Sequence, residues 1–178
     1  MAHTYNVVIL GNSGSGKSTL VNRVCSGEYT HTYIHPSGMV SHTYNVNVYS
    51  TQAKQNTSVC LNLYEHANME HYCSADAALL CVNSTENHHQ RLNELRESVS
   101  DFSEVHKTTP IVLVSTKVDV VGAKPITNTE LSRAHIVVTK HILVSARTSY
   151  HIFEPLQALI RILLDDDTLF VCENNTKL

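Results

Sequence analysis

Residues 5–19, YNVVILGNSGSGKST, decide which fold this chain can adopt, because an apolar run stops there at a glycine-rich loop. The loop fits the pattern GxxxxGK[ST], in which backbone N–H groups surround the phosphates of a nucleotide. Glycine at several positions lets successive N–H groups turn toward one anion. An apolar strand before the loop and a helical stretch after it are the context that the motif requires. The predicted phosphate-binding residues are Gly11, Asn12, Ser13, Gly14, Ser15, Gly16, Lys17, Ser18 and Thr19.

Two side chains of this loop predict a metal ion as well as phosphate. Lys17 supplies a positive charge for the terminal phosphates, and Ser18 offers a hydroxyl to Mg²⁺. A helix that begins at the same point directs the positive end of its dipole at the anion. We therefore expect a nucleotide with Mg²⁺, and Ser18 as a metal ligand.

The composition narrows the class of protein. The 178 residues suit one domain, and a net charge of −3 with a pI near 6.4 gives no electrostatic reason to bind nucleic acid. The five cysteines are odd in number and lack CxxC spacing, as expected of reduced thiols. Ala2 excludes N-myristoylation, and Cys172 lies too far from the end for prenylation. With no signal peptide and no apolar run of membrane-spanning length, we expect a cytoplasmic protein without a lipid anchor.

Short apolar runs alternate with helical patterns along the chain, which predicts an α/β fold with a mostly parallel sheet and helices on both faces. Residues 41–50 and 58–64 are joined by the turn-like segment TQAKQNT, so we expect an antiparallel hairpin at one edge. We expect one domain over residues 1–165 and a C-terminal tail over 166–178. The six expected strands are residues 5–10, 41–50, 58–64, 77–82, 111–115 and 141–145.

Three helices follow from capping signals and side-chain spacing. Thr127 and Glu130 form a capping box for a helix over residues 128–138. Pro155 falls in the first turn of the last helix, where its missing N–H costs nothing. Another helix is expected to open at His88 and His89. The expected apolar faces consist of Leu92, Leu95, Val99 and Phe102 in this helix and of Ile152, Leu156, Leu159, Ile160 and Leu163 in the last one.

Two further motifs predict which base the nucleotide carries. TKVD, at 116–119, follows an expected strand at the carboxyl end of the sheet, where open α/β folds bind their ligands. A carboxylate there can accept hydrogen bonds from N1–H and the amino group of guanine, a donor pair that adenine lacks. SAR, at 145–147, ends the next strand, where a backbone N–H could meet guanine O6. Without the phosphate loop, the charges of TKVD would be interpreted as solvated loop residues; with it, we expect them to bind guanine. The predicted base-binding residues are Thr116, Lys117, Asp119, Ser145, Ala146 and Arg147.

Together these motifs resemble those of the small GTPases of the Ras superfamily, and the Rab branch most, over about residues 5–164. GNSGSGKS is similar to the Rab form GDSGVGKS, TKVD resembles NKxD, and SAR stands where the family has SAK. The resemblance implies a P-loop, Ras-like fold, GDP or GTP with Mg²⁺, and protein partners. It implies that Asp119 fixes guanine, that Lys117 packs along the base and that Ala146 contacts O6. Thr116 replaces the usual asparagine, and Tyr29 either packs against the base or anchors the first switch in the core.

The departures from the family fall on the parts that sense and hydrolyse the terminal phosphate. The first switch reads YIHPSG at 33–38, so an ungapped comparison puts Pro36 where Rab proteins have a magnesium-binding threonine. Proline has neither hydroxyl nor N–H, and a one-residue slip would be needed for Ser37 to take the role. The second switch, YEHANME at 64–70, has Asn68 in place of a glycine and Met69 in place of the water-orienting glutamine. Glu65 is expected to reach the metal through water, and most of the second-switch helix is expected to be missing.

The sequence therefore leaves three functions open. One is a slow GTPase switch of the vesicle-trafficking type, with impaired γ-phosphate sensing. Another is a nucleotide-bound scaffold subunit, a pseudo-GTPase that no longer switches. The third, a P-loop kinase for a small metabolite, is disfavoured because TKVD and SAR specify a base and the sequence contains no arginine-rich lid. We expect regulated protein binding rather than turnover, and we assign no catalytic residue.

Two remaining features concern the tail and the histidines. Residues 169–172, LFVC, form an apolar patch that either contacts a partner or folds back on its own sheet. His66, His71 and Cys73 lack the paired spacing of a zinc site, so we expect surface or core positions for them.

Overall fold

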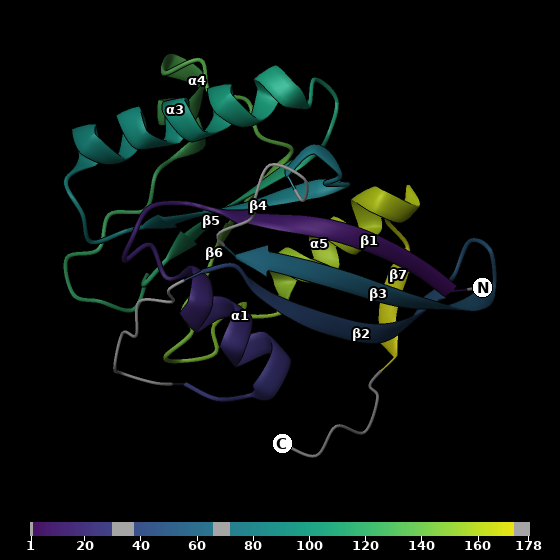
Figure 1. Cartoon of the computed structure of the whole chain (residues 1–178). Helices are drawn as coiled ribbons and strands as arrows, with labels where there is room; N and C mark the ends of the chain where they lie inside the picture. The colour runs from purple at the N-terminus through teal and green to yellow at the C-terminus, as the bar shows by residue number, and fades with distance from the viewer. Residues whose placement is uncertain (1, 30–37, 66–71, 173–178) are drawn as a thin grey trace.

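The computed structural model describes residues 2–29, 38–65 and 72–172, which form a seven-stranded sheet with helices on both faces (Figure 1). The strand order is β6-β5-β4-β1-β3-β2-β7. Neighbouring strands are parallel except at β2, which is antiparallel to both β3 and β7. The α/β class and the mostly parallel sheet are thereby confirmed. The strands are β1 (Ala2–Leu10), β2 (Val40–Ser50), β3 (Gln55–Glu65), β4 (Ala77–Asn83), β5 (Ile111–Thr116), β6 (Lys140–Leu143) and β7 (Leu169–Cys172), and the helices are α1 (Lys17–Ser26), α3 (His88–Val105), α4 (Asn128–Arg133) and α5 (Glu154–Leu164).

Two hydrophobic cores lie on opposite faces of the sheet, because side chains alternate along each strand. Val7 and Ile9 of β1 belong to the core under α1 and α5, whereas Val8 belongs to the core under α3 and α4. Figure 1 shows the same two layers of helices. β4 is buried along its whole length, as is typical of a parallel strand covered on both faces. The predicted site therefore lies at the carboxyl ends of strands that cannot shift without disturbing both cores.

The helices begin where their signals predict, but one ends early. Thr127 and Glu130 form the predicted capping box, α3 opens at His88, and Pro155 lies in the first turn of α5. The expected helix over 128–138 ends at Arg133 instead. His135 adopts φ +55°, and its N–H and that of Ile136 donate to the carbonyls of Ser132 and Leu131, which is a Schellman ending. Ile136 then enters the core beside Leu131, so burial of that side chain favours an early stop.

The strand boundaries differ from the expected ones at two turns. β2 and β3 pair as far as Ser50 and Gln55, so the hairpin turn takes four residues, 51–54, rather than the seven of TQAKQNT. The expected strand 141–145 ends at Leu143. Ser145 lies beyond it because its N–H donates to the carbonyl of Tyr150, which turns the chain out of the sheet.

Residues of the expected tail add the seventh strand, β7, to the sheet, so β2 is not the edge strand that we predicted. The Asp166 carboxylate accepts hydrogen bonds from the Ser50 hydroxyl at 2.5 Å and from the Thr168 N–H at 2.8 Å. Arg161 of α5 donates to the carbonyl of Leu169, whose side chain is 4% exposed. Of the two interpretations of LFVC, the structure therefore has the tail folded back on its own sheet.

Candidate nucleotide-binding site

The glycines of the phosphate loop are required by backbone geometry. Gly11 has φ +127°, and a Cβ built on it would lie 2.3 Å from the carbonyl oxygen of Cys81 on β4. Gly16 has φ +91°, and a Cβ there would lie 3.2 Å from the Thr116 hydroxyl. Any larger residue at Gly11 would force the loop away from β4. The loop thus lies directly against the carboxyl ends of β4 and β5.

The Lys17 side chain contacts the start of the phosphate loop that precedes it in the sequence. The residue is 7% exposed, and its Nζ donates to the carbonyls of Gly11 at 2.6 Å and Asn12 at 2.8 Å. A buried ammonium group requires such acceptors or an anion, because water cannot solvate it. The ammonium is therefore held beside the Gly11 and Asn12 carbonyls, where a phosphate could become a further acceptor.

Two residues of TKVD bind the phosphate loop directly. The Thr116 hydroxyl lies 2.7 Å from the carbonyl oxygen of Ser15 and 3.1 Å from that of Val82, and Thr116 is 4% exposed. The Lys117 Nζ donates to the carbonyl of Gly14 at 2.8 Å, with the Lys117 backbone at φ +58°. These contacts join segments that are 101 and 103 residues apart in the sequence. The predicted base-binding segment and the predicted phosphate-binding loop therefore form one structure.

The SAR segment lies beside TKVD. The Val118 N–H donates to the carbonyl of Val144 at 3.4 Å, which holds the two loops together. Ser145 is fully buried and its hydroxyl accepts the Thr148 N–H at 3.1 Å, so its role is to shape the turn. Asp119 is half-buried, and its carboxylate has no hydrogen-bond partner among the described residues. This leaves the Asp119 carboxylate available to the donors of a base.

The Ser18 hydroxyl and the Glu65 carboxylate meet where α1 begins and β3 ends. Ser18 Oγ donates to Glu65 Oε2 at 2.5 Å, and Glu65 is only 1% exposed. Hydroxyl and carboxylate oxygens are ligands that Mg²⁺ prefers, and a buried carboxylate without a cation is costly. The pair therefore fits the predicted metal.

Burial raises the pKa of the Cys81 thiol, which lies beneath the phosphate loop, to about 12. The charge of Lys17 opposes this shift and the charge of Glu65 reinforces it.

His42 is a site residue that the sequence analysis missed. Its Nε2 lies 3.3 Å from Glu65 Oε1, on the other side of the carboxylate from Ser18. The signal was present in the alternation of β2, because His42 shares a face with the buried Val46 and Val48. A histidine at the end of such an apolar row calls for a polar partner.

The remaining predicted residues are distributed as follows. Asn12, Ser13 and Arg147 are exposed, and Thr19, Tyr29 and Ala146 are half-buried. Tyr29 ends the first described segment, and its two proposed roles stay predictions. Pro36, Ser37, Asn68 and Met69 lie outside the described residues, as do His66 and His71 of the zinc question.

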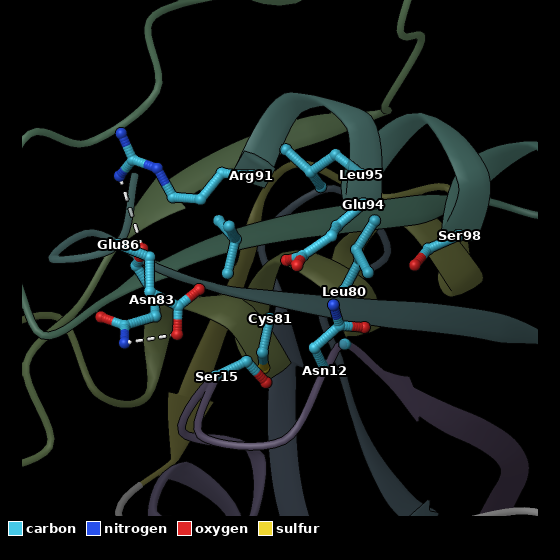
Figure 2. A pocket seen from close by; sticks show the side chains of 12 residues that line it. Asn12, Ser15, Leu80, Cys81, Asn83, Glu86, Arg91, Glu94, Leu95 and Ser98 are labelled. Atoms are coloured by element: carbon cyan, nitrogen blue, oxygen red, sulfur yellow. Dashed lines mark hydrogen bonds between the residues drawn. The ribbon is translucent and has the colours of Figure 1, made fainter. Parts of the chain in front are cut away.

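A small cleft separates the phosphate loop from α3 (Figure 2). Asn12 and Ser15 line it from the loop, and Glu94 lines it from α3. Arg91 forms part of its wall, is 1% exposed, and donates to the carbonyl of Lys124 at 2.7 Å. The predicted base-binding residues do not line this cleft, so it flanks the candidate site rather than forming it.

Comparison with known proteins agrees with this geometry. The model of the Ras family matches residues 6–165, nearly the whole described part of the chain. The chain belongs to the Ras family. Two relatives of this Ras-family protein are the GTP-binding nuclear protein Ran of Giardia intestinalis and the GTP-binding nuclear protein GSP1 of Encephalitozoon cuniculi. The first is 26% identical over 93% of this chain and 80% of its own length, and the second is 25% identical over 97% and 82%. These matches support a small GTP-binding protein.

Two negative findings apply to the described part of this Ras-family chain. Over residues 2–29, 38–65 and 72–172, no helix is long and apolar enough to cross a membrane. Within the same ranges, no three His, Cys, Asp or Glu side chains gather where they could hold a metal ion. The candidate Mg²⁺ site accordingly rests on Ser18 and Glu65, with phosphate oxygens as the natural further ligands.

Proposed function

We propose that this Ras-family protein binds GDP and GTP with Mg²⁺ at the carboxyl ends of β1 and β5, and acts by binding protein partners rather than by turnover. The observation that carries the proposal is the pair of hydrogen bonds from TKVD to the phosphate loop. Because Thr116 binds the Ser15 carbonyl and Lys117 binds the Gly14 carbonyl, one ligand can meet both segments. A nucleotide is such a ligand, with its base and phosphates at opposite ends.

Each predicted residue then has a defined task. Lys17 and the loop N–H groups bind the phosphates. Ser18 binds the Mg²⁺, which neutralises phosphate charge, and Glu65 reaches the metal through water. Asp119 accepts from the guanine edge, and Ala146 offers its N–H to O6. The Thr116 hydroxyl directs its proton at the Ser15 carbonyl of the loop, so it positions the loop instead of reading the base.

We further propose that hydrolysis is slow. Orienting the attacking water contributes much of the rate of this reaction, and the thioether of Met69 cannot do so. Pro36 offers neither a metal ligand nor a donor at the position of the usual threonine. The same departures favour the alternative, a nucleotide-bound scaffold that does not switch, because a ligand shifts a conformation only by its difference in affinity for the two states.

The cellular role is inferred from the branch of the family that the phosphate loop resembles. The phosphate loop is most like that of Rab proteins, which favours vesicle trafficking, whereas the names of the two relatives describe nuclear GTP-binding proteins. We propose the trafficking role on the loop sequence. Imaging of the tagged protein in its own cells tests it: vesicular signal supports trafficking, and accumulation in the nucleus contradicts it.

Exchange of one side chain tests the base assignment. In Asp119→Asn, the amide can donate to the C2 oxygen of xanthine, whereas the carboxylate accepts from the amino group of guanine. We expect the preference for GDP over XDP to reverse in a competition assay with fluorescent nucleotide. The exposed Asp167→Asn serves as the matched control and should keep the wild-type preference. Unchanged guanine selectivity in Asp119→Asn would remove Asp119 from the site.

Single-turnover GTP decay and hydrogen exchange separate the slow switch from the scaffold. We expect decay slower than that of an ordinary Rab protein, with little recovery in Met69→Gln because Pro36 and Asn68 remain. Decay at an ordinary rate contradicts the slow-hydrolysis proposal. For residues 29–40 and 65–75, large GTP-dependent protection supports the switch, and equal protection with GDP and GTP supports the scaffold.

A further inference from the structure

The Glu65 carboxylate is held from two sides by side chains of different elements. Ser18 Oγ of α1 donates to Oε2 at 2.5 Å, and His42 Nε2 of β2 lies 3.3 Å from Oε1. A carboxylate oxygen cannot donate, so this contact is attractive when the His42 Nε2 carries a proton. Both oxygens of a carboxylate that is 1% exposed are therefore engaged. Among the described residues, no lysine or arginine nitrogen lies within 4.0 Å of Glu65, so the Ser18 hydroxyl and the His42 imidazole are the polar groups that contact it.

The position of His42 is determined by strand register. Val40 of β2 pairs with Glu65, and His42 pairs with Leu63. His42 is thus the diagonal neighbour of Glu65 on the same face of the sheet, within reach of a long side chain. The imidazole is 21% exposed and the carboxylate 1%, so their contact is shielded from solvent on one side. The register places this pair at the mouth of the core under α1, next to the phosphate loop.

The Glu65 carboxylate needs a neighbouring group that fixes its orientation. Two methylene groups, each with rotatable bonds, separate the Glu65 carboxylate from the backbone. Each freely rotating bond must be fixed before the carboxylate can face a metal ion, and this lowers affinity unless packing or hydrogen bonds fix it in advance. His42 is the group that can do so without occupying Oε2. This argument rests on the proposed Mg²⁺-dependent binding of nucleotide.

We propose that His42 is a positioning residue of the magnesium site, which holds the Glu65 carboxylate through Oε1 and thereby raises the affinity for Mg²⁺. Outer partners of a ligand commonly change metal affinity by about 10–100-fold when they are removed. Here a single contact at 3.3 Å has partial solvent access, so we expect the lower end of that range, about tenfold. Removal of His42 should therefore change the affinity for Mg²⁺ and leave the selectivity for the base unchanged.

The test measures release of N-methylanthraniloyl-GDP at a fixed pH while free Mg²⁺ is varied with EDTA. His42→Ala removes the donor, and His42→Gln keeps an N–H donor on a shorter side chain. Thr43→Ala is the matched control, because Thr43 is the neighbour of His42 on the exposed face of β2. We expect His42→Ala to need about tenfold more Mg²⁺ for half-maximal retention of nucleotide, with release rates that converge to wild type at saturating Mg²⁺. His42→Gln should recover at least half of the loss on a logarithmic scale, and Thr43→Ala should match wild type.

The outcomes separate the two claims. If wild-type protein retains no GDP at any Mg²⁺ concentration, the proposed function fails, and the role of His42 fails with it. If wild type retains GDP in a Mg²⁺-dependent way and His42→Ala shows the same dependence, the role of His42 alone is overturned. Faster release by His42→Ala that persists at saturating Mg²⁺ also overturns it, because the residue would then support the fold of β2 and not the metal.

Discussion

Thr116→Val tests whether the base segment and the phosphate loop act as one unit. Valine has nearly the shape of threonine but replaces the hydroxyl by a methyl group. The Thr116 hydroxyl has one proton, and the shorter distance, 2.7 Å to Ser15 O against 3.1 Å to Val82 O, indicates that the loop carbonyl receives it. The variant therefore removes the donor of a buried carbonyl at a residue that is 4% exposed. Such a loss costs about 1–2 kcal/mol.

Two assays measure this cost. For a protein of this size, about 1–2 kcal/mol corresponds to a melting temperature lower by roughly 2–8 °C. Because the loop must be ordered to bind phosphate, we expect the Kd for GDP to rise by about five- to thirtyfold, as the same free energy implies. Thr108→Val, at an exposed threonine, should change neither quantity. An unchanged melting temperature together with an unchanged Kd for Thr116→Val would refute the coupling of the two segments.

Three further variants test other contacts. Lys17→Ala should weaken GDP binding by at least about tenfold in calorimetry, since it removes a charge-assisted donor. Lys140→Ala, at an exposed lysine, should leave the affinity for GDP unchanged. Equal affinity of the two variants would exclude Lys17 from the site. Asp166→Ala should increase hydrogen exchange of residues 169–172, because the Asp166 carboxylate connects the segment before β7 to Ser50. If these residues exchange no faster in Asp166→Ala than in the control Asp167→Ala, this role of Asp166 is contradicted. Burial lowers the pKa of His141, whose Nε2 lies 2.8 Å from the Ser115 hydroxyl, so the unfolded chain binds the proton more readily. The stability that the neutral, buried His141 contributes is complete above the ordinary pKa of 6.5 and is lost as the pH falls below that value. The melting temperature should therefore decline more from pH 7.5 to 5.5 in wild type than in His141→Gln. Parallel pH profiles of the two proteins would contradict this role of His141.

The parts of the fold that sequence could predict have local signals. The phosphate loop needs glycines because Gly11 approaches β4, and the α4 capping box lies within four residues. β7 could not be assigned in this way, because pairing of residues 169–172 with β2 is a non-local contact that competes with exposure of the same patch to a partner. The network that decides it joins Asp166 to Ser50, 116 residues away.

The candidate site shows the same division. TKVD and the phosphate loop were predicted to share a ligand, but the direction of the Thr116 hydroxyl toward the loop depends on how closely Gly16 approaches it. His42 carries no motif, and only the register of β2 against β3 brings it to Glu65. Sequence thus predicts residues that belong to a fixed local pattern, and it misses those that meet another side chain across the sheet.

The measurement that tests the central claim most directly is the identity of the nucleotide bound to the purified protein. The protein is purified in Mg²⁺, denatured, and the released nucleotide is identified by chromatography and compared with the amount of protein. We predict close to one guanine nucleotide per chain, GDP or GTP, and loss of it in Lys17→Ala. Release of adenine nucleotide would contradict the base assignment, and a protein that carries none and binds no added GDP in Mg²⁺ would contradict nucleotide binding itself.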